Sequence, residues 1–235
     1  MSRPARVSRR ALASLGLGLL VETGACRSSP VRVDFASNGF GARERAAIVA
    51  KVEATFSEVR ALLPALGSSL TFTVTKGCDV IPETGETATA IPPSTVAWVV
   101  CPEGPSGVLG VVASQLRASL FHELHHLVRD TVIPRGTLVD HMVAEGLATA
   151  FERDAAGARP PWGEYPPEVD SWVRELTALP RDANVATWLY GRLGDGRRWV
   201  GLRAGTYLAD RTMRRLRRSA AELVVEPVAT FLRDA

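Results

Sequence analysis

The feature that most constrains the fold of this 235-residue chain is a change in its hydrophobic pattern near Gly107. Upstream of Gly107, the segment 31–35 alternates apolar with polar residues, as a half-buried strand does, and 70–76 and 95–101 are two further candidate strands. Downstream, apolar residues recur every three or four positions, which is typical of helices that bury one face. Strands first and helices after predict one α+β domain, with a small N-terminal mixed or antiparallel sheet and a mainly helical C-terminal half.

We assign this single domain to residues 31–235, and two further segments complete its N-terminal half. Residues 42–63 contain no Gly or Pro and carry apolar residues at spacings of three and four, which predicts a helix that ends at Pro64. Residues 81–93 are rich in Pro, Thr and Gly, so we expect a loop there with a short edge strand at 88–91. In the C-terminal half the pattern predicts helices at 108–130, 137–156, 167–179, 185–192, 199–218 and 227–232.

Residues 1–25 are typical of an export signal, because a basic start precedes a mostly apolar run of eleven residues and then small residues before Cys26. A membrane-spanning helix needs roughly 20 apolar residues, so this run is too short. Ser8–Leu12 resembles a twin-arginine signal, and Thr23–Cys26 resembles a bacterial lipobox, in which the Cys is lipidated. We therefore expect an exported protein, periplasmic or lipid-anchored to the cell envelope through Cys26, with 26–30 as a tether. An uncleaved anchor is the alternative.

The net charge of +3 belongs to this export signal. Residues 1–25 hold four Arg and one Glu, and removing them from the 28 basic and 25 acidic residues leaves 24 of each. A neutral mature chain argues against a nucleic-acid partner, which requires clustered surplus Lys and Arg. The exception is the run of arginines from Arg211 to Arg218, which is either a solvated helix face or a functional basic patch.

The three cysteines are consistent with export. If Cys26 carries lipid, Cys78 and Cys101 remain as a pair, and in an oxidising compartment they can form a disulfide. Two free buried thiols are the alternative. A disulfide here would stabilise the fold by ~2–4 kcal/mol, because it restricts the unfolded chain.

All four histidines lie between positions 122 and 141, and three of them belong to the sequence FHELHH at 121–126, which contains an HExxH motif. Residues four apart share a helix face, so His122 and His126 can direct both imidazoles at one ion. Glu123 is rotated by about 100° from His122, so it is better placed to take a proton from water than to chelate. Leucines at 116, 120, 124 and 127 form an apolar stripe through the motif, which supports the helix.

A catalytic zinc needs a third protein ligand besides two His. The metzincin arrangement is excluded, because it requires Gly and His where this chain has Arg129 and Val132. A carboxylate from the next helix is the other solution, and Glu145, which follows His126 by 19 residues, is the candidate. His141, one turn before Glu145, would replace it if Glu145 were not a ligand.

The segment before Glu145 supports this assignment. Pro134 and Gly136 interrupt the chain, and Thr137 with Asp140 suit the N-cap and the capping acid of a new helix. Glu145 then lies about two turns into that helix. An antiparallel return of the chain can therefore bring its carboxylate to the two histidines.

Several segments resemble a known bacterial family, the predicted zinc-dependent proteases of unknown function, which are similar in pattern to gluzincin metallopeptidases. The resemblance rests on HELHH at 122–126, LVD at 138–140 and AEGLA at 144–148. It continues with decreasing specificity through WLYG at 188–191 and WVG at 199–201.

This resemblance implies a zincin-like HExxH helix, with Zn²⁺ held by His122, His126 and Glu145 and with Glu123 as the general base. The chain departs from the pattern at two positions. Thermolysin-like relatives carry an Asp four residues after the ligand Glu, where this chain has Thr149, so the residue that orients a ligand His is unassigned. After the Gly of WVG an aromatic residue is expected, and this chain has Leu202.

The remaining polar candidates each have two interpretations. His141 shares a helix face with Glu145, so it is either a catalytic donor to the oxyanion or a hydrogen-bonded core residue. His125 flanks the metal-binding face and is interpreted as structural. Tyr190 and Tyr207 are weaker candidates for the oxyanion donor, because most helical Tyr pack with their hydroxyl satisfied.

From the sequence we therefore expect a zinc-dependent metallopeptidase that hydrolyses peptide bonds in the cell envelope by Glu-assisted attack of a zinc-activated water. The alternative is a catalytically inactive zinc-binding lipoprotein that acts as a binding or assembly module. The expected partner is a peptide or protein substrate and not a nucleic acid, contact with the membrane would be through a lipid on Cys26, and the protein is expected to be a monomer.

Overall fold

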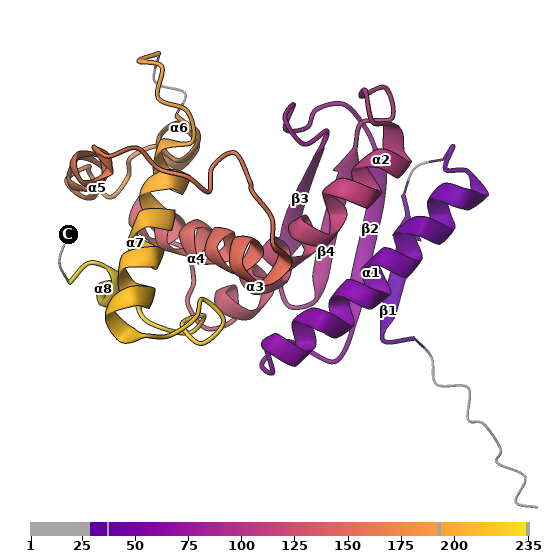
Figure 1. Ribbon diagram of the computed structural model, residues 1–235, viewed down its shortest axis with the longest axis horizontal. Coiled ribbons are helices and arrows are strands. Elements are labelled where there is room, and N and C mark those ends of the chain that lie inside the picture. The colour runs from indigo at the N-terminus through magenta and orange to yellow at the C-terminus, as the bar shows by residue number, and fades with distance from the viewer. Residues whose placement is uncertain (1–28, 37, 192–193, 234–235) are drawn as a thin grey trace, which may run out of the picture.

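The computed structural model describes residues 29–36, 38–191 and 194–233, so the expected export signal and Cys26 lie outside the described residues. Within these ranges the fold is α+β, as the hydrophobic pattern predicts, with strands in the N-terminal half and helices in the C-terminal half (Figure 1). No helix among the described residues is both long and apolar enough to cross a membrane.

The sheet has four strands in the spatial order β1-β2-β4-β3. Strands β1 (Val31–Phe35), β2 (Leu70–Lys76) and β4 (Thr95–Val100) run parallel to one another, and β3 (Glu86–Ile91) runs antiparallel to β4 at the edge. The sheet is therefore mixed. The expected edge strand at 88–91 is confirmed and begins two residues earlier.

One face of the sheet is buried by helices. Phe72 on β2 and Trp98 on β4 are fully buried, whereas their neighbours Thr71 and Thr73 on the other face are only half-buried. This alternation follows from the two-residue period of a strand. Helix α1 (Ala42–Leu62), together with α2 (Gly107–Ser114), crosses the buried face (Figure 1).

The helical half contains α2 (Gly107–Ser114), α3 (Leu116–Asp130), α4 (Leu138–Ala156), α5 (Val169–Thr177), α6 (Val185–Tyr190), α7 (Val200–Leu216) and α8 (Val228–Phe231). The single helix expected over 108–130 is wrong, because the chain divides into α2 and α3 at Gln115. No Pro or Gly marks this break. The Ser114 hydroxyl donates to the carbonyl of Gly110 at 2.8 Å, and the break allows both Val111 and Leu116 to be buried.

Helix α4 begins as its sequence predicts. The hydroxyl of Thr137 accepts the backbone N–H of Asp140 at 3.3 Å, and the Asp140 carboxylate accepts the backbone N–H of Thr137 at 2.8 Å. This reciprocal capping satisfies donors that the first turn of a helix otherwise leaves unpaired. The start of α4, and with it the depth of Glu145 in the helix, is fixed by the cap.

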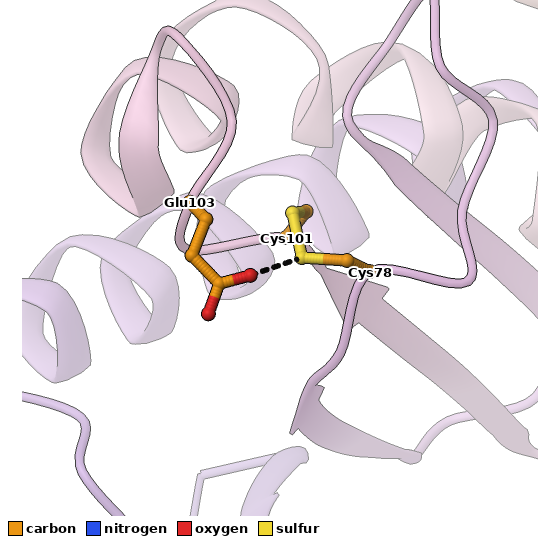
Figure 2. Close-up of side chains that lie close together, drawn as sticks. All are labelled: Cys78, Cys101 and Glu103. Carbon is orange, nitrogen blue, oxygen red and sulfur yellow. Dashed lines mark hydrogen bonds between the residues drawn. A yellow bond between two sulfur atoms is a disulfide. The ribbon is translucent and has the colours of Figure 1, made fainter.

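Cys78 and Cys101 form a disulfide, which confirms the expected pairing (Figure 2). The two residues follow the adjacent parallel strands β2 and β4. The carboxylate of Glu103 lies 2.9 Å from Sγ of Cys78. Because both sulfurs are bonded to each other, these cysteines do not offer thiolates to a metal ion.

The C-terminal arginines contact the segment that follows α7. Arg215 donates to the carbonyl of Thr230 at 2.6 Å, and Arg218 pairs with Glu226. These contacts join the run to the C-terminal segment.

Candidate metal centre

Three side chains from two helices form a cluster of potential ligands. His122 and His126 lie one turn apart on α3, and their Nε2 atoms are 3.1 Å apart. Glu145 on α4 places Oε2 3.2 Å from Nε2 of His122 and Oε1 3.4 Å from Nε2 of His126. The structure thus brings together the three residues that the sequence singled out as ligands.

The separations suit one zinc ion. Nitrogen and oxygen ligands lie about 2.1 Å from zinc, and in a tetrahedral arrangement they are then roughly 3.4 Å from one another. The three observed separations, 3.1, 3.2 and 3.4 Å, lie close to this value. Two imidazoles and one carboxylate are also a donor set that zinc favours when it retains a position open for water or substrate.

The electrostatics of the cluster favour a cation. Burial alone would lower the pKa of His122, but hydrogen bonds to Glu145 and Glu152 raise this pKa well above its usual value. Burial alone would raise the pKa of Glu145, but the charge of His126 and hydrogen bonds to both histidines lower this pKa well below its usual value. The Glu145 carboxylate is therefore charged at neutral pH and available as a ligand.

Arg135, from the loop between α3 and α4, contacts the same carboxylate. Its Nη1 donates to Oε1 of Glu145 at 3.1 Å, and its Nη2 donates to the Asp130 carboxylate at 2.5 Å. The guanidinium joins the end of α3 to the ligand on α4. Sequence reasoning missed Arg135, because a single Arg in a loop carries no pattern that predicts its partner.

Glu152 orients the first ligand histidine. Its Oε2 lies 3.1 Å from Nδ1 of His122, and both side chains are buried. When Nδ1–H donates to this carboxylate, Nε2 of His122 retains its lone pair for the ion. Glu152 lies seven residues after Glu145, which is two helical turns, so it shares a face with the ligand. Thr149, four residues after Glu145, is buried and its hydroxyl has no hydrogen-bond partner among the described residues, so it does not take this role.

Glu123 lines the same cavity as His122, His126 and Glu145. Its Oε2 accepts the backbone N–H of Ala90 on the edge strand β3 at 2.7 Å. Ala90 is on the outer edge of the sheet, so this bond fixes the carboxylate between the strand and the metal cluster. That position is the one a general base requires when it must take a proton from water beside the ion.

Sequence reasoning also missed a second buried carboxyl, which lies between β3 and α3. Glu86 on β3 accepts the indole N–H of Trp98 at 2.6 Å and the hydroxyl of Ser119 at 2.9 Å. Burial raises the pKa of Glu86 from 4.5 to about 7, and the charge of Glu123 acts in the same direction. Glu86 therefore connects β3 to α3 just before the HExxH motif.

The other histidines and tyrosines fall into two groups, those that line the cavity and those that are structural. His141 lines the cavity beside Glu145, and burial, with the charge of Arg135, lowers its pKa below the usual 6.5. His125 is fully buried and its Nε2 lies 3.3 Å from the carbonyl of Ala220, so it is structural. Tyr190 lines the cavity, whereas the hydroxyl of Tyr207 donates to Asp170 at 2.7 Å and is used for packing helices together.

The positions that a metzincin would use for its third ligand serve other purposes. Arg129 is buried and donates to the carbonyl of Val224 at 2.8 Å, and Val132 is 57% exposed beyond the end of α3. Neither can complete a metal site.

The metal cluster opens into a cavity of about 800 Å³ that includes Glu123, His141, Glu152 and Glu86 among its lining residues. Strand β3 contributes one wall, and α6 with the start of α7 contributes the wall opposite. The stretch 81–93, expected from the sequence to be a loop with an edge strand, therefore contributes to the lining of this cavity.

An α+β fold with an HExxH helix beside an antiparallel edge strand and a ligand Glu on the next helix defines a protein with an HExxH-type candidate zinc centre. The chain belongs to the family described as "Predicted Zn-dependent protease (DUF2268)", whose model matches residues 74–233. This stretch begins in β2 and includes every residue of the cluster, and it confirms the resemblance noted in the sequence. No curated protein and no solved structure matches the chain.

Proposed function

We propose that this protein is a zinc metallopeptidase of the HExxH type, with a ligand Glu on the following helix. The observation that carries the proposal is the convergence of His122, His126 and Glu145, whose ligand atoms all lie within 4.8 Å of one another, with Glu123 in the same cavity. The family description, predicted Zn-dependent protease, is in agreement.

Each side chain has a distinct task in this proposal. Zn²⁺, when bound, supplies Lewis acidity toward the scissile carbonyl and toward water. Glu123, held by Ala90, takes a proton from the attacking water and delivers it to the leaving amine. His141 is neutral near pH 7, so its ring N–H can donate to the oxygen that gains negative charge.

The sequence left a second function open, a zinc-binding module without turnover. Its first support was the absence of an Asp at Thr149, and the contact between Glu152 and His122 removes that support. Its second was Leu202, which lines the cavity wall and does not obstruct the metal cluster. The peptidase is therefore the function that the site supports best.

We also propose that the protein is exported and acts in the cell envelope as a monomer, either lipid-anchored through Cys26 or released into the periplasm. The support is the signal-like sequence of residues 1–25 together with the disulfide between Cys78 and Cys101, which requires oxidising conditions. Labelling with a radioactive fatty acid in cells, compared between the natural chain and Cys26→Ser, tests the lipid anchor.

The test of the activity uses the full-length protein, its zinc content and a peptide-library digest. We expect one zinc per chain, cleavage that a chelator abolishes, and cleavage restored by added zinc. Glu123→Gln should retain zinc and lose hydrolysis by a factor of about 10³ or more, while the exposed control Glu164→Gln should resemble the natural protein. Absence of zinc, or full activity of Glu123→Gln, would contradict the proposal.

A further inference from the structure

The wall of the cavity opposite β3 differs in chemistry from the metal cluster. It comes from three segments: the crossing after α4, helix α6 and the start of α7. We call it the aromatic wall and define it as Trp162, Leu189, Tyr190, Trp199 and Leu202. Four of these five residues are buried, and Tyr190 is 39% exposed.

Trp199 contacts the other two rings of the aromatic wall. The ring centroids of Trp162 and Trp199 are 5.1 Å apart, and those of Tyr190 and Trp199 are 5.8 Å apart with nearly perpendicular planes. These are favourable edge and tilted arrangements for aromatic pairs. The backbone N–H of Trp199 also donates to the carbonyl of Tyr190 at 3.0 Å, which joins α6 to α7.

Trp199 is held in a strained backbone conformation. Its φ of 60° and ψ of 32° are in the left-handed region, which costs a non-glycine residue about 1 kcal/mol or more. Such strain persists where the surrounding structure fixes it, and here the Trp199 side chain is buried and in contact with two neighbours. Trp162 packs on one side, and the guanidinium of Arg198 lies 4.9 Å from the ring centroid.

Arg198 also connects the aromatic wall to the sheet half. Its Nη1 lies 2.5 Å from the carboxylate of Glu83, in the loop before β3. Glu83 and Trp199 both line the cavity, so this partly exposed ion pair joins the two walls on that side. The wall is thus a fixed surface beside the metal cluster.

We infer that the aromatic wall is a subsite for a bulky apolar side chain, above all an aromatic one, next to the peptide bond that is hydrolysed. The inference rests on the proposed function. A substrate held between β3 and the metal cluster has one side chain directed at the opposite wall, and that wall offers rings and branched aliphatic groups. A fixed apolar surface makes the binding of an apolar side chain favourable, because apolar area is removed from water and the protein does not have to reorganise.

The test measures binding and not turnover. Capped dipeptide hydroxamates, which chelate zinc, are titrated into the zinc-loaded full-length protein with Phe, Leu, Ala or Glu as the variable side chain. We expect the order Phe, Leu, Ala, Glu, with Phe favoured over Ala by about 30- to 100-fold, because a buried aromatic side chain contributes most of that difference.

A filling variant tests the location of the subsite. Ala186 on α6 is exposed and lines the cavity, so Ala186→Trp adds bulk beside the aromatic wall with little disturbance of the core. The preference for Phe over Ala should fall below about threefold. The matched control Ala178→Trp, at an exposed position after α5 that is not among the lining residues, should retain the natural preference.

The outcomes distinguish a failure of the proposed peptidase function from a failure of the proposed subsite. If zinc is absent and no hydroxamate binds, the proposed function fails. If zinc is present and the hydroxamates bind without regard to the side chain, the subsite is wrong and the peptidase stands. A preference for the Glu probe would also overturn the subsite, since it would assign recognition to the cavity-lining Arg159 or Arg135. If Ala186→Trp does not fold, the ranking of the four probes on the natural protein still decides the question.

Discussion

At the scale of single residues, Glu152 and Glu86 determine how α3, the helix that carries the two ligand histidines, orients its side chains. Neither carboxylate is a ligand. Both are buried where α3 packs against a neighbouring element. Glu152 acts on His122 from α4, and Glu86 acts on Ser119 from β3. Each can be removed without removing a ligand.

Replacing Glu152 should weaken zinc binding. In Glu152→Ala the Nδ1–H of His122 loses its acceptor, so the ring is less well oriented and less basic, and we expect zinc affinity to fall by about 10- to 100-fold. Glu152→Gln retains an acceptor oxygen and should lose less. Competition with a fluorescent zinc chelator measures the affinity, and Glu164→Ala is an exposed control. An unchanged affinity in Glu152→Ala would show that the contact does not support the metal.

Replacing Glu86 should change how stability depends on pH. Its pKa is about 7 in the folded protein and 4.5 as the ordinary value, so the folded state favours the neutral form. The stabilisation is complete below pH 4.5 and is lost as the pH rises through about 7, by about 3 kcal/mol in total. Glu86→Gln stays neutral. Its free energy of unfolding minus that of the natural chain should therefore increase by about 3 kcal/mol between pH 4.5 and 8.

Urea unfolding of the two proteins with chelator present, at several pH values, provides this difference. Glu164→Gln is the control for the loss of a carboxylate that is not buried. A difference that does not change with pH would mean that Glu86 ionises normally.

At this scale the sequence predicted the residues that spacing determines. One helical turn relates His122 to His126, and a capped second helix returns Glu145 to them, so local rules suffice. The role of Glu152 was not predicted, because the thermolysin-like pattern places the orienting acid one turn after the ligand Glu and Glu152 lies two turns after Glu145. Glu86 depends on a strand and a helix that meet only in three dimensions, and no local pattern shows that contact.

At the scale of elements, the crossing of α4 and α7 is set by two glycines. A Cβ on Gly146 would lie 2.0 Å from the carbonyl oxygen of Gly205, and a Cβ on Gly205 would lie 1.9 Å from that of Met142. The backbones of the two helices are therefore in direct contact, and the crossing occurs one residue after the ligand Glu145. This contact explains why α4 and α7 carry Gly146 and Gly205 in mid-helix.

Gly205→Ala should separate α7 from α4. Backbone atoms cannot yield as a flexible side chain does, so we expect a loss of at least 1–3 kcal/mol in the free energy of unfolding, above the gain that Ala normally brings to a helix. Zinc affinity should fall as well, because Glu145 moves with α4. Urea unfolding and chelator competition measure the two effects.

The control is Gly67→Ala, since Gly67 has an ordinary φ and no atom within 4 Å of a Cβ placed there. Equal stabilities of the two variants would show that the helices separate without cost.

Element boundaries show the same division between local and tertiary causes. The start of α4 was predicted correctly from Thr137 and Asp140, because a capping box is a local interaction. The break at Gln115 was not predicted, because it follows from the different surfaces that α2 and α3 must cover. The pattern of apolar residues is continuous through that break.

At the scale of the whole molecule, the sheet half and the helical half meet along β3 and α3, and the metal cluster lies at that boundary. The disulfide is placed differently: it joins the ends of β2 and β4 within the sheet half, and neither cysteine is among the residues that line the cavity (Figure 2). The disulfide should therefore stabilise the fold without taking part in the site.

The double variant Cys78→Ser, Cys101→Ser separates these two properties. Joining residues 23 apart should stabilise the natural protein by about 3 kcal/mol through the restricted unfolded chain, so the variant should unfold at lower urea concentration by that amount. Reductant should lower the stability of the natural protein to the same extent and leave the variant unchanged. Zinc affinity, measured well below the unfolding transition, should be equal in both proteins, because the ligands are on α3 and α4. If removing the disulfide lowered zinc affinity, the two halves would be coupled through the sheet, and the edge strand that holds Glu123 at Ala90 would be the connecting element.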